Sequence, residues 1–125
     1  MPEIELTTSQ NNASVNVIAG DRLKKGDTLP AFQCRLLDNG AGYDLTDKQP
    51  MLHMKGRDAD SKRLDGAEMN VLDENNGEVE YQWESTDTSK AGTFDLEVVV
   101  VSKNGKERTF PLKDFISVQI FEDLQ

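Results

Sequence analysis

The chain has 125 residues, 36% hydrophobic and 30% charged, which favours one well-solvated domain large enough to build its own core. Lysine and arginine total 14 against 23 acidic residues, a formal net charge of −9. Nucleic acid and anionic membranes are therefore disfavoured as partners, because binding to phosphate requires basic side chains that replace counterions. Acidic runs never exceed two residues, which also argues against a mimic of DNA.

The sequence also argues against a membrane span, a signal peptide and an intramolecular disulfide. No stretch approaches the roughly 18 consecutive apolar residues of a membrane span. The first ten residues carry two glutamates and no apolar run, so we expect no signal peptide and synthesis in a cytoplasm. The single cysteine, Cys34, excludes an intramolecular disulfide, and its apolar flanks indicate a buried core residue rather than a reactive thiol.

Strands rather than helices are predicted in the first half of the chain, because apolar and polar residues alternate with a period of two. Phe32, Cys34 and Leu36 share one strand face. A polar, charged loop is expected over residues 56–66. Extended segments are predicted at residues 4–6, 14–18, 28–37, 43–46 and 51–55, with a turn at residues 11–12 between the first two.

The second half repeats this alternation and adds two hairpin signals, Asn76-Gly77 and Asn104-Gly105, whose residues accept positive φ. Strands are predicted at residues 69–71, 79–83, 94–101 and 116–120. In the last two strands some apolar residues face away from the predicted core. These residues are Val99, Val101, Phe115 and Phe121.

About eight or nine strands at intervals of about 8–12 residues predict an all-β, antiparallel sandwich. Ala91-Gly92-Thr93-Phe94, just before the valine-rich strand, gives it an immunoglobulin-like feature, an aromatic at the corner between two sheets. We expect a single domain over residues 1–125, with residues 1–3 and 122–125 frayed.

The chain offers few residues for catalysis or for cofactors. His53 is the single histidine, and no Gly-x-Ser-x-Gly element accompanies it, so we interpret it as a partly exposed sheet residue. One cysteine and one histidine do not build a tetrahedral zinc site without carboxylates. Neither glycine-rich phosphate-binding motif is present. We therefore predict no catalytic residues, no cofactor and no enzymatic activity.

Two oxygen-rich segments leave calcium as an open question. Asp58, Asp60 and Asp65 lie in one predicted loop, where alternating oxygen ligands suit a hard cation. Lys62 and Arg63 interrupt them, and the spacing is not that of an EF-hand. Solvated turn acids explain this group better, and the same holds for a second group, Asp73, Asn75 and Glu78. A carboxylate pair for glycoside hydrolysis also stays open, since the chain has 23 acidic residues.

Three aromatic residues provide an alternative, carbohydrate-binding interpretation. Tyr81 and Trp83 share a strand face and, with Tyr43, would form a platform for a sugar ring if they were exposed. Aromatics on an alternating strand belong more often to the core, which is the interpretation we favour.

A series of short segments, in order, resembles a known family. The segments are Gly26-Asp27, Leu36-Leu37-Asp38-Asn39-Gly40, Tyr43-Asp44-Leu45-Thr46, Lys55-Gly56, Gly77-Glu78-Val79-Glu80-Tyr81 and Ala91-Gly92-Thr93-Phe94. Over about residues 15–121 the chain resembles the N-terminal domain of the baseplate upper protein of tailed phages of Gram-positive bacteria. Thr46-Asp47 and Asp58-Ala59 depart from the family pattern, in loops.

The resemblance implies an immunoglobulin-like sandwich without catalysis or cofactor that attaches a receptor-binding device to the tail core, and hence a place in the virion. Its expected partners are other tail or baseplate proteins, with a homo-oligomer possible. In that family helices and a further domain usually follow, so the chain is either an excised domain or a short relative. We expect contact through shape complementarity and β-edge pairing, with Val99, Val101, Phe115 and Phe121 at the contact.

Overall fold

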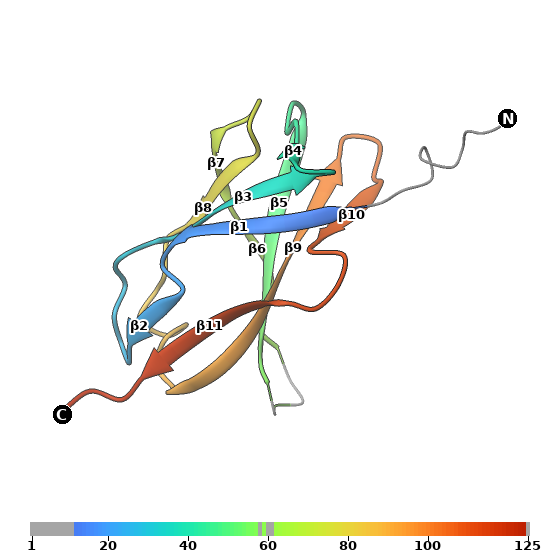
Figure 1. Ribbon diagram of the computed structural model, residues 1–125. Helices are drawn as coiled ribbons and strands as arrows, with labels where there is room; N and C mark the ends of the chain where they lie inside the picture. Colours follow the sequence, from blue (N-terminus) through green and yellow to red (C-terminus); the bar gives the residue numbers. More distant parts are fainter. Residues whose placement is uncertain (1–11, 58, 60–61, 125) are drawn as a thin grey trace, which may run out of the picture.

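The computed structural model describes residues 12–57, 59 and 62–124, and every regular element in them is a strand (Figure 1). One sheet has five strands: β1 (Ala13–Ala19), β3 (Phe32–Asp38), β4 (Ala41–Gly42), β7 (Asn70–Asp73) and β8 (Glu78–Tyr81). The other has six: β2 (Arg22–Lys24), β5 (Lys48–Gly56), β6 (Lys62–Glu68), β9 (Gly92–Ser102), β10 (Glu107–Phe110) and β11 (Ile116–Phe121). The strand predicted at residues 4–6 lies outside the described residues.

The two sheets form a β-sandwich, which confirms the predicted fold class. In the five-stranded sheet the order is β1-β3-β8-β7, with β4 beside β3. In the six-stranded sheet the order is β2-β11-β9-β5-β6, with β10 beside β9. All pairs are antiparallel except β2 and β11, which run parallel. That pair was not predicted, because a three-residue strand gives no periodic signal.

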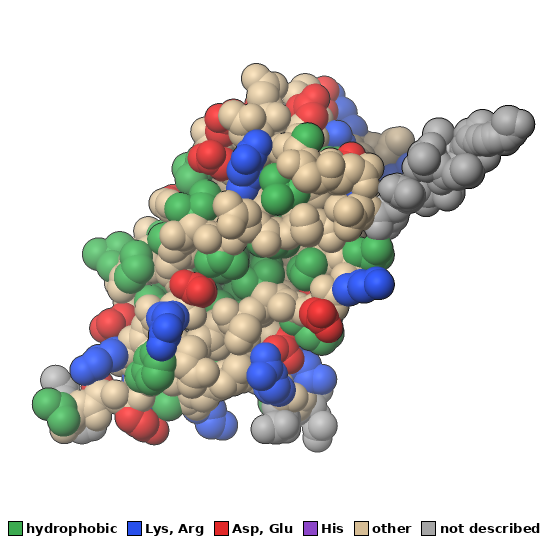
Figure 2. Space-filling model, viewed as in Figure 1, with side chains coloured by type: hydrophobic (Ala, Val, Ile, Leu, Met, Phe, Trp, Pro, Cys, Tyr) green, Lys and Arg blue, Asp and Glu red, His purple; other side chains and the backbone are tan. Residues whose placement is uncertain are grey.

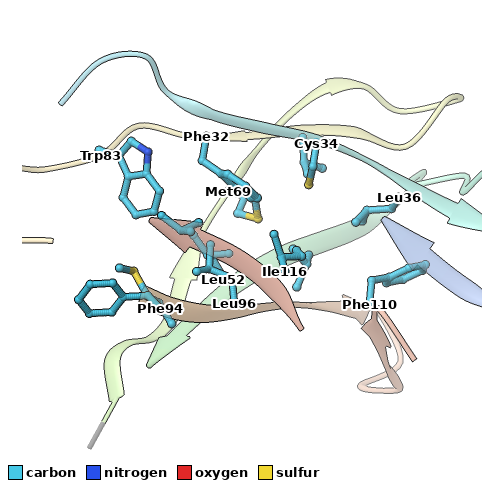
Figure 3. Close-up of a cluster of buried hydrophobic side chains, with 14 of the residues drawn as sticks. Phe32, Cys34, Leu36, Leu52, Met69, Trp83, Phe94, Leu96, Phe110 and Ile116 are labelled. Atoms are coloured by element: carbon cyan, nitrogen blue, oxygen red, sulfur yellow. The ribbon is translucent and has the colours of Figure 1, made fainter. Parts of the chain in front are cut away.

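The core lies between the sheets and follows the predicted alternation (Figure 3). Phe32, Cys34 and Leu36 of β3 are completely buried, as predicted. The facing sheet contributes the even-numbered residues of β9 and β11, which alternate with outward-facing neighbours. These buried residues are Phe94, Leu96, Val98, Val100, Ile116, Val118 and Ile120.

Both predicted hairpin turns are present. The β7–β8 turn has Gly77 at φ 74°, and a Cβ there would lie 2.5 Å from the carbonyl oxygen of Leu36. Gly77 is therefore required both for its backbone conformation and for this close approach. The β9–β10 turn contains Gly105 at φ 86°.

The loop predicted over residues 56–66 is wrong in its second part, because β6 begins at Lys62 and pairs with β5. Gly66, at φ 88°, is an extra residue where the register shifts, between Asp65 opposite His53 and Ala67 opposite Leu52. Such a bulge breaks the period of two. Leu64 and Ala67, which both pack against the core, are therefore three residues apart, and the strand was not recognised.

The two sides of the sandwich differ. β6 and β7 are separated only by the buried Met69, so one stretch of chain passes from one sheet into the other and closes that side. On the other side the chain also crosses between the sheets, from β1 through Gly20 and Asp21 into β2, but β2 pairs with only the last three residues of β11; Figure 1 shows β1 and β11 in front. Two contacts join the sheets there: the amide of Leu112 donates to the Ala13 carbonyl at 2.9 Å, and Arg108 pairs with Asp38 at 2.9 Å.

Candidate protein-contact surfaces

The outer face of the six-stranded sheet carries all four residues predicted to make protein contacts. Val99 and Val101 lie on β9 on either side of the buried Val100 and are half-buried. Phe115 directly precedes β11 and Phe121 ends it, and they are 55% and 41% exposed. The alternation of β11 places both on the side opposite its buried residues. The structure therefore gathers these residues on one face, but it does not bring all four together.

The apolar centre of this face is formed by Val99, Val101 and Met51. Met51 of β5 stands directly opposite Val99, and Gln49 stands opposite Val101. On the other flank, Thr109 and Glu107 of β10 oppose the same two valines. Directly opposed side chains on one face of a sheet are in contact, so the valines lie in an apolar strip with polar neighbours. Met51 escaped the sequence analysis because it starts a predicted strand, where its face was unassigned.

A hollow of about 260 Å³ adjoins this strip, and we call it the Phe115 hollow. Phe115 forms one wall and residues of β9, β5 and β6 form the rest, among them Glu97, Asp95, His53 and Lys62. Arg57 donates to Asp95 Oδ1 from Nη2 at 2.9 Å and from Nε at 3.2 Å. The lining of the hollow thus combines an aromatic side chain with acidic and basic groups, a composition suited to protein contact.

Chemistry in the hollow would have to involve His53, whose position as a partly buried sheet histidine confirms its prediction. Its Nδ1 has no hydrogen-bond partner among the described residues; Asp65 Oδ1 lies 3.4 Å away and accepts a hydrogen bond from Lys62 Nζ at 3.2 Å. Among the described residues that line the hollow there is no serine, threonine or cysteine beside this imidazole.

Phe121 belongs to a separate site at the far end of β11. Six residues separate it from Phe115, about 20 Å along an extended strand. The guanidinium of Arg22 lies 5.5 Å from the centre of its ring, a cation–π distance. The two phenylalanines therefore cannot contact one small epitope together with Val99.

The free edges of the sheets form a second group of candidate surfaces. β2 has three residues, two of them basic, and β7 has four. β6 has four charged residues and the Gly66 bulge. Short length, charge and bulges are the features that protect edge strands from pairing with other chains. β1 has seven residues and no charge, and its one bulge lies near its end, at Ile18.

β1 forms the edge of the five-stranded sheet on the side where the chain continues through Gly20 and Asp21 into β2 of the other sheet. Among residues 12–57, 59 and 62–124, no strand pairs with its outer side, where Leu112 bonds only the first residue, Ala13. Val15 and Val17 are half-buried against the core, and Ile18 is 51% exposed. Figure 2 shows hydrophobic side chains gathered in the band between β1 and β11.

The aromatic residues of the carbohydrate interpretation do not form an exposed platform. Trp83 is 1% exposed, and its indole N–H donates to the Gly20 carbonyl at 3.1 Å. Tyr81 packs edge-on against Trp83 at 5.4 Å. Tyr43 packs against Phe110, at the other end of the core. The exposure that this interpretation requires of Trp83 is therefore wrong, and its assignment to the core is confirmed.

Two buried polar residues, Asp87 and Thr88, were missed in a segment predicted to be only a polar connection. Asp87 Oδ2 accepts from the Tyr81 hydroxyl at 2.7 Å and from the Glu84 amide at 2.9 Å. Burial, and secondarily this hydrogen bond, raise the pKa of Tyr81. Thr88 donates to the Asp27 carbonyl at 2.8 Å. Through these hydrogen bonds both residues hold their loop against neighbouring segments. The serine- and threonine-rich sequence around them did not indicate that they are buried.

The remaining candidate residues, Cys34 and the two oxygen-rich groups, form no functional site among the residues that the structure describes. Cys34 is buried, as predicted, and burial raises the pKa of its thiol to about 12. Asp58 and Asp60 lie outside the described residues, so the calcium question stays open there. In the second oxygen-rich group, Asp73 accepts from the Asn76 side chain at 2.8 Å within the turn. No described group of three or more acids, histidines or cysteines is placed to hold a metal ion.

Comparison with known proteins adds no assignment, since neither a family model nor a curated protein sequence matches the chain. No helix among the described residues is long and apolar enough to span a membrane.

Proposed function

We propose that this chain is a non-enzymatic docking domain of a phage or prophage tail baseplate, which attaches a host-recognition device to the tail core by protein–protein contact. The observation that carries the proposal is the outer face of the six-stranded sheet. Met51, Val99 and Val101 form an apolar strip there, and the exposed ring of Phe115 stands beside it. A half-covered apolar strip with polar neighbours is typical of the centre of a contact surface.

The shape and the charges of the Phe115 hollow support contact with a protein. The hollow is open and wide enough for one inserted side chain. Around it, Asp95 is paired with Arg57 and Asp65 with Lys62. A partner with an apolar side chain for the hollow and polar groups for its rim fits this arrangement. The baseplate setting and the immunoglobulin-like class rest on the resemblance of the sequence segments.

The proposal is tested by asking which proteins the purified chain retains from disrupted phage tails of a Gram-positive host, identified by mass spectrometry. We expect tail or baseplate proteins to be retained by the wild-type chain. The Phe115→Asp and Val99→Asp variants should not retain these tail proteins, because each substitution buries a charge at the contact. Leu72→Asp is the matched control, since Leu72 is also exposed but lies on β7 of the other sheet.

Retention of no tail protein, or equal retention by Phe115→Asp and the control, would contradict the proposal. A separate titration with cell-wall sugars tests the carbohydrate alternative. Because the Trp83 indole is buried, we expect its fluorescence to stay unchanged on addition of sugar.

A further inference from the structure

We propose that β1 pairs with β1 of a second copy of this chain, antiparallel and around a two-fold axis at Asn16, so that the five-stranded sheets of the two copies join into one. This surface lies on the other sheet from the Phe115 hollow. The inference therefore does not depend on the proposed function, and a dimer formed this way leaves the docking face open.

The first argument is the free backbone of β1. Its inner side pairs with β3 from Ala13 to Ala19, while on its outer side Leu112 bonds only Ala13. From Ser14 onward, every second residue of β1 therefore presents its amide and carbonyl to a further strand. An antiparallel neighbour satisfies such a row completely, which is how extended segments add to sheet edges.

The second argument is charge. Pairing an edge strand with a second copy takes its charged side chains out of water and sets the residue on the two-fold axis against its own equivalent, so an edge without charge is the best suited to self-pairing. The chain carries a net charge of −9, yet β1 contains no charged residue. β6 carries two basic and two acidic residues, and β2 has basic residues at both ends. Among the described edges, β1 alone combines this length with the absence of charge.

The third argument is the match of side chains in this register. An axis at Asn16 places Val15 of one copy opposite Val17 of the other, and Ser14 opposite Ile18. Both valines are half-buried on the inner side, so the pairing completes their burial. Directly opposed apolar side chains on one face of a sheet stabilise a strand pair.

The two ends of β1 are also complementary. Ile18 is 51% exposed at one end, and Leu112 is 50% exposed beside the other end. Leu112 borders a hollow of about 400 Å³ together with Ser14 and Pro111. In the antiparallel arrangement, Ile18 of each copy reaches the hollow beside Leu112 of its partner. One operation therefore covers both exposed side chains in both copies.

The mass in solution tests the proposal. We expect the wild-type chain at about 100 μM to have about twice its 14.0 kDa mass, and to dissociate on dilution. Asn16→Lys places two lysines against each other at the axis and should weaken the dimer about tenfold or more. Asn70→Lys is the matched control, an exposed asparagine on edge strand β7 of the same sheet, and should leave the dimer unchanged.

A cross-link fixes the register. In a Cys34→Ala background, Asn16→Cys should give a disulfide-linked dimer with oxidised glutathione, because directly opposed strand residues have Cα atoms about 4.5–5.5 Å apart. Asn70→Cys should not. A wild-type chain that is monomeric at about 100 μM would overturn the proposal. So would a dimer that resists Asn16→Lys, and so would one that vanishes when residues 1–10 are deleted, which would indicate that those residues, rather than β1, hold the dimer together.

Discussion

On the side formed by β6 and β7, the chain passes from one sheet to the other at the single buried residue Met69. On the opposite side β1 ends the five-stranded sheet and passes through Gly20 and Asp21 into β2, which pairs with only the last three residues of β11. The first side carries Lys62, Arg63, Asp65 and Glu68 on its edge, and Gly66 makes a bulge there. The second side has an uncharged edge, and Ile18 and Leu112 beside it are exposed.

This difference shows where the molecule resists pairing with other chains and where it permits it. Charged residues and a bulge on β6 prevent another strand from adding to it, since the charges would lose water and the ladder would be interrupted. β1 lacks the charges and has its bulge only at the end. The two sides therefore differ in how well their edge strands, β6 and β1, are protected against pairing with another chain, although these two strands are of similar length.

The largest effect is expected at Met69, which links β6 to β7. Its side chain is buried, and its amide donates to the Pro50 carbonyl at 3.0 Å. Met69→Ala should lower the free energy of unfolding by about 2–5 kcal/mol, because it leaves a cavity where the two sheets share one chain. Chemical denaturation measures this, with Leu72→Ala, at an exposed site on β7, as a control that should cost far less. A loss as small as that of the control would mean that the closed side is not closed by packing.

The next effect is a dependence of stability on alkaline pH through Cys34, which stands opposite Val17 of the open edge. Its thiol has a pKa of about 12 in the folded chain, against an ordinary value of 9.0. Between these values the unfolded chain loses the proton and the folded chain keeps it. Stability is therefore full below pH 9 and falls as the pH rises, by about 1.4 kcal/mol per pH unit.

Denaturation at pH 8, 9 and 10 measures this slope, and Cys34→Ala should reduce it. The pKa of Tyr81 is also raised, from an ordinary 10.0, so the range below pH 10 isolates the thiol. An equal slope in the variant would show that water reaches Cys34 from the open side.

A smaller effect is expected at the bulge of β6. Gly66 has φ 88°, and a Cβ there would meet His53 Cε1 at 3.7 Å, an ordinary contact. Space is therefore available, and Gly66→Ala should cost about 1 kcal/mol through its backbone conformation. Gly66→Asn should cost less, because asparagine tolerates positive φ better. Thermal denaturation compares the two; equal stability of Gly66→Ala and the wild type would argue against this bulge.

The smallest effect is expected for the ion pair that bridges the open side. Arg108 Nη2 lies 2.9 Å from Asp38 Oδ1, and this hydrogen bond raises the pKa of the guanidinium. Both side chains are partly exposed, so solvent screens the pair. A double-mutant cycle with Arg108→Gln and Asp38→Asn should give a coupling free energy of about 0.5 kcal/mol, lowered by salt. A coupling of several kcal/mol would mean that the pair closes this side as firmly as Met69 closes the other.

The pattern of alternation predicted most of the strands and the core. Phe32, Cys34 and Leu36 could be assigned to the interior because a period of two depends only on the local pleat of the chain. The outward positions of Val99, Val101, Phe115 and Phe121 followed in the same way. β6 was missed because Gly66 interrupts the period, and β2 because three residues are too few to show one.

Local alternation along the chain is enough to show which faces of the strands are apolar, where two hairpins turn and that the domain is built of β-structure. Which strands are neighbours and which edges stay free depends on how the folded sheets are assembled. Pairing joins residues far apart in the chain, and an edge strand alternates like a central one. The hollow beside Phe115 and the free side of β1 therefore exist only once the sheets have formed.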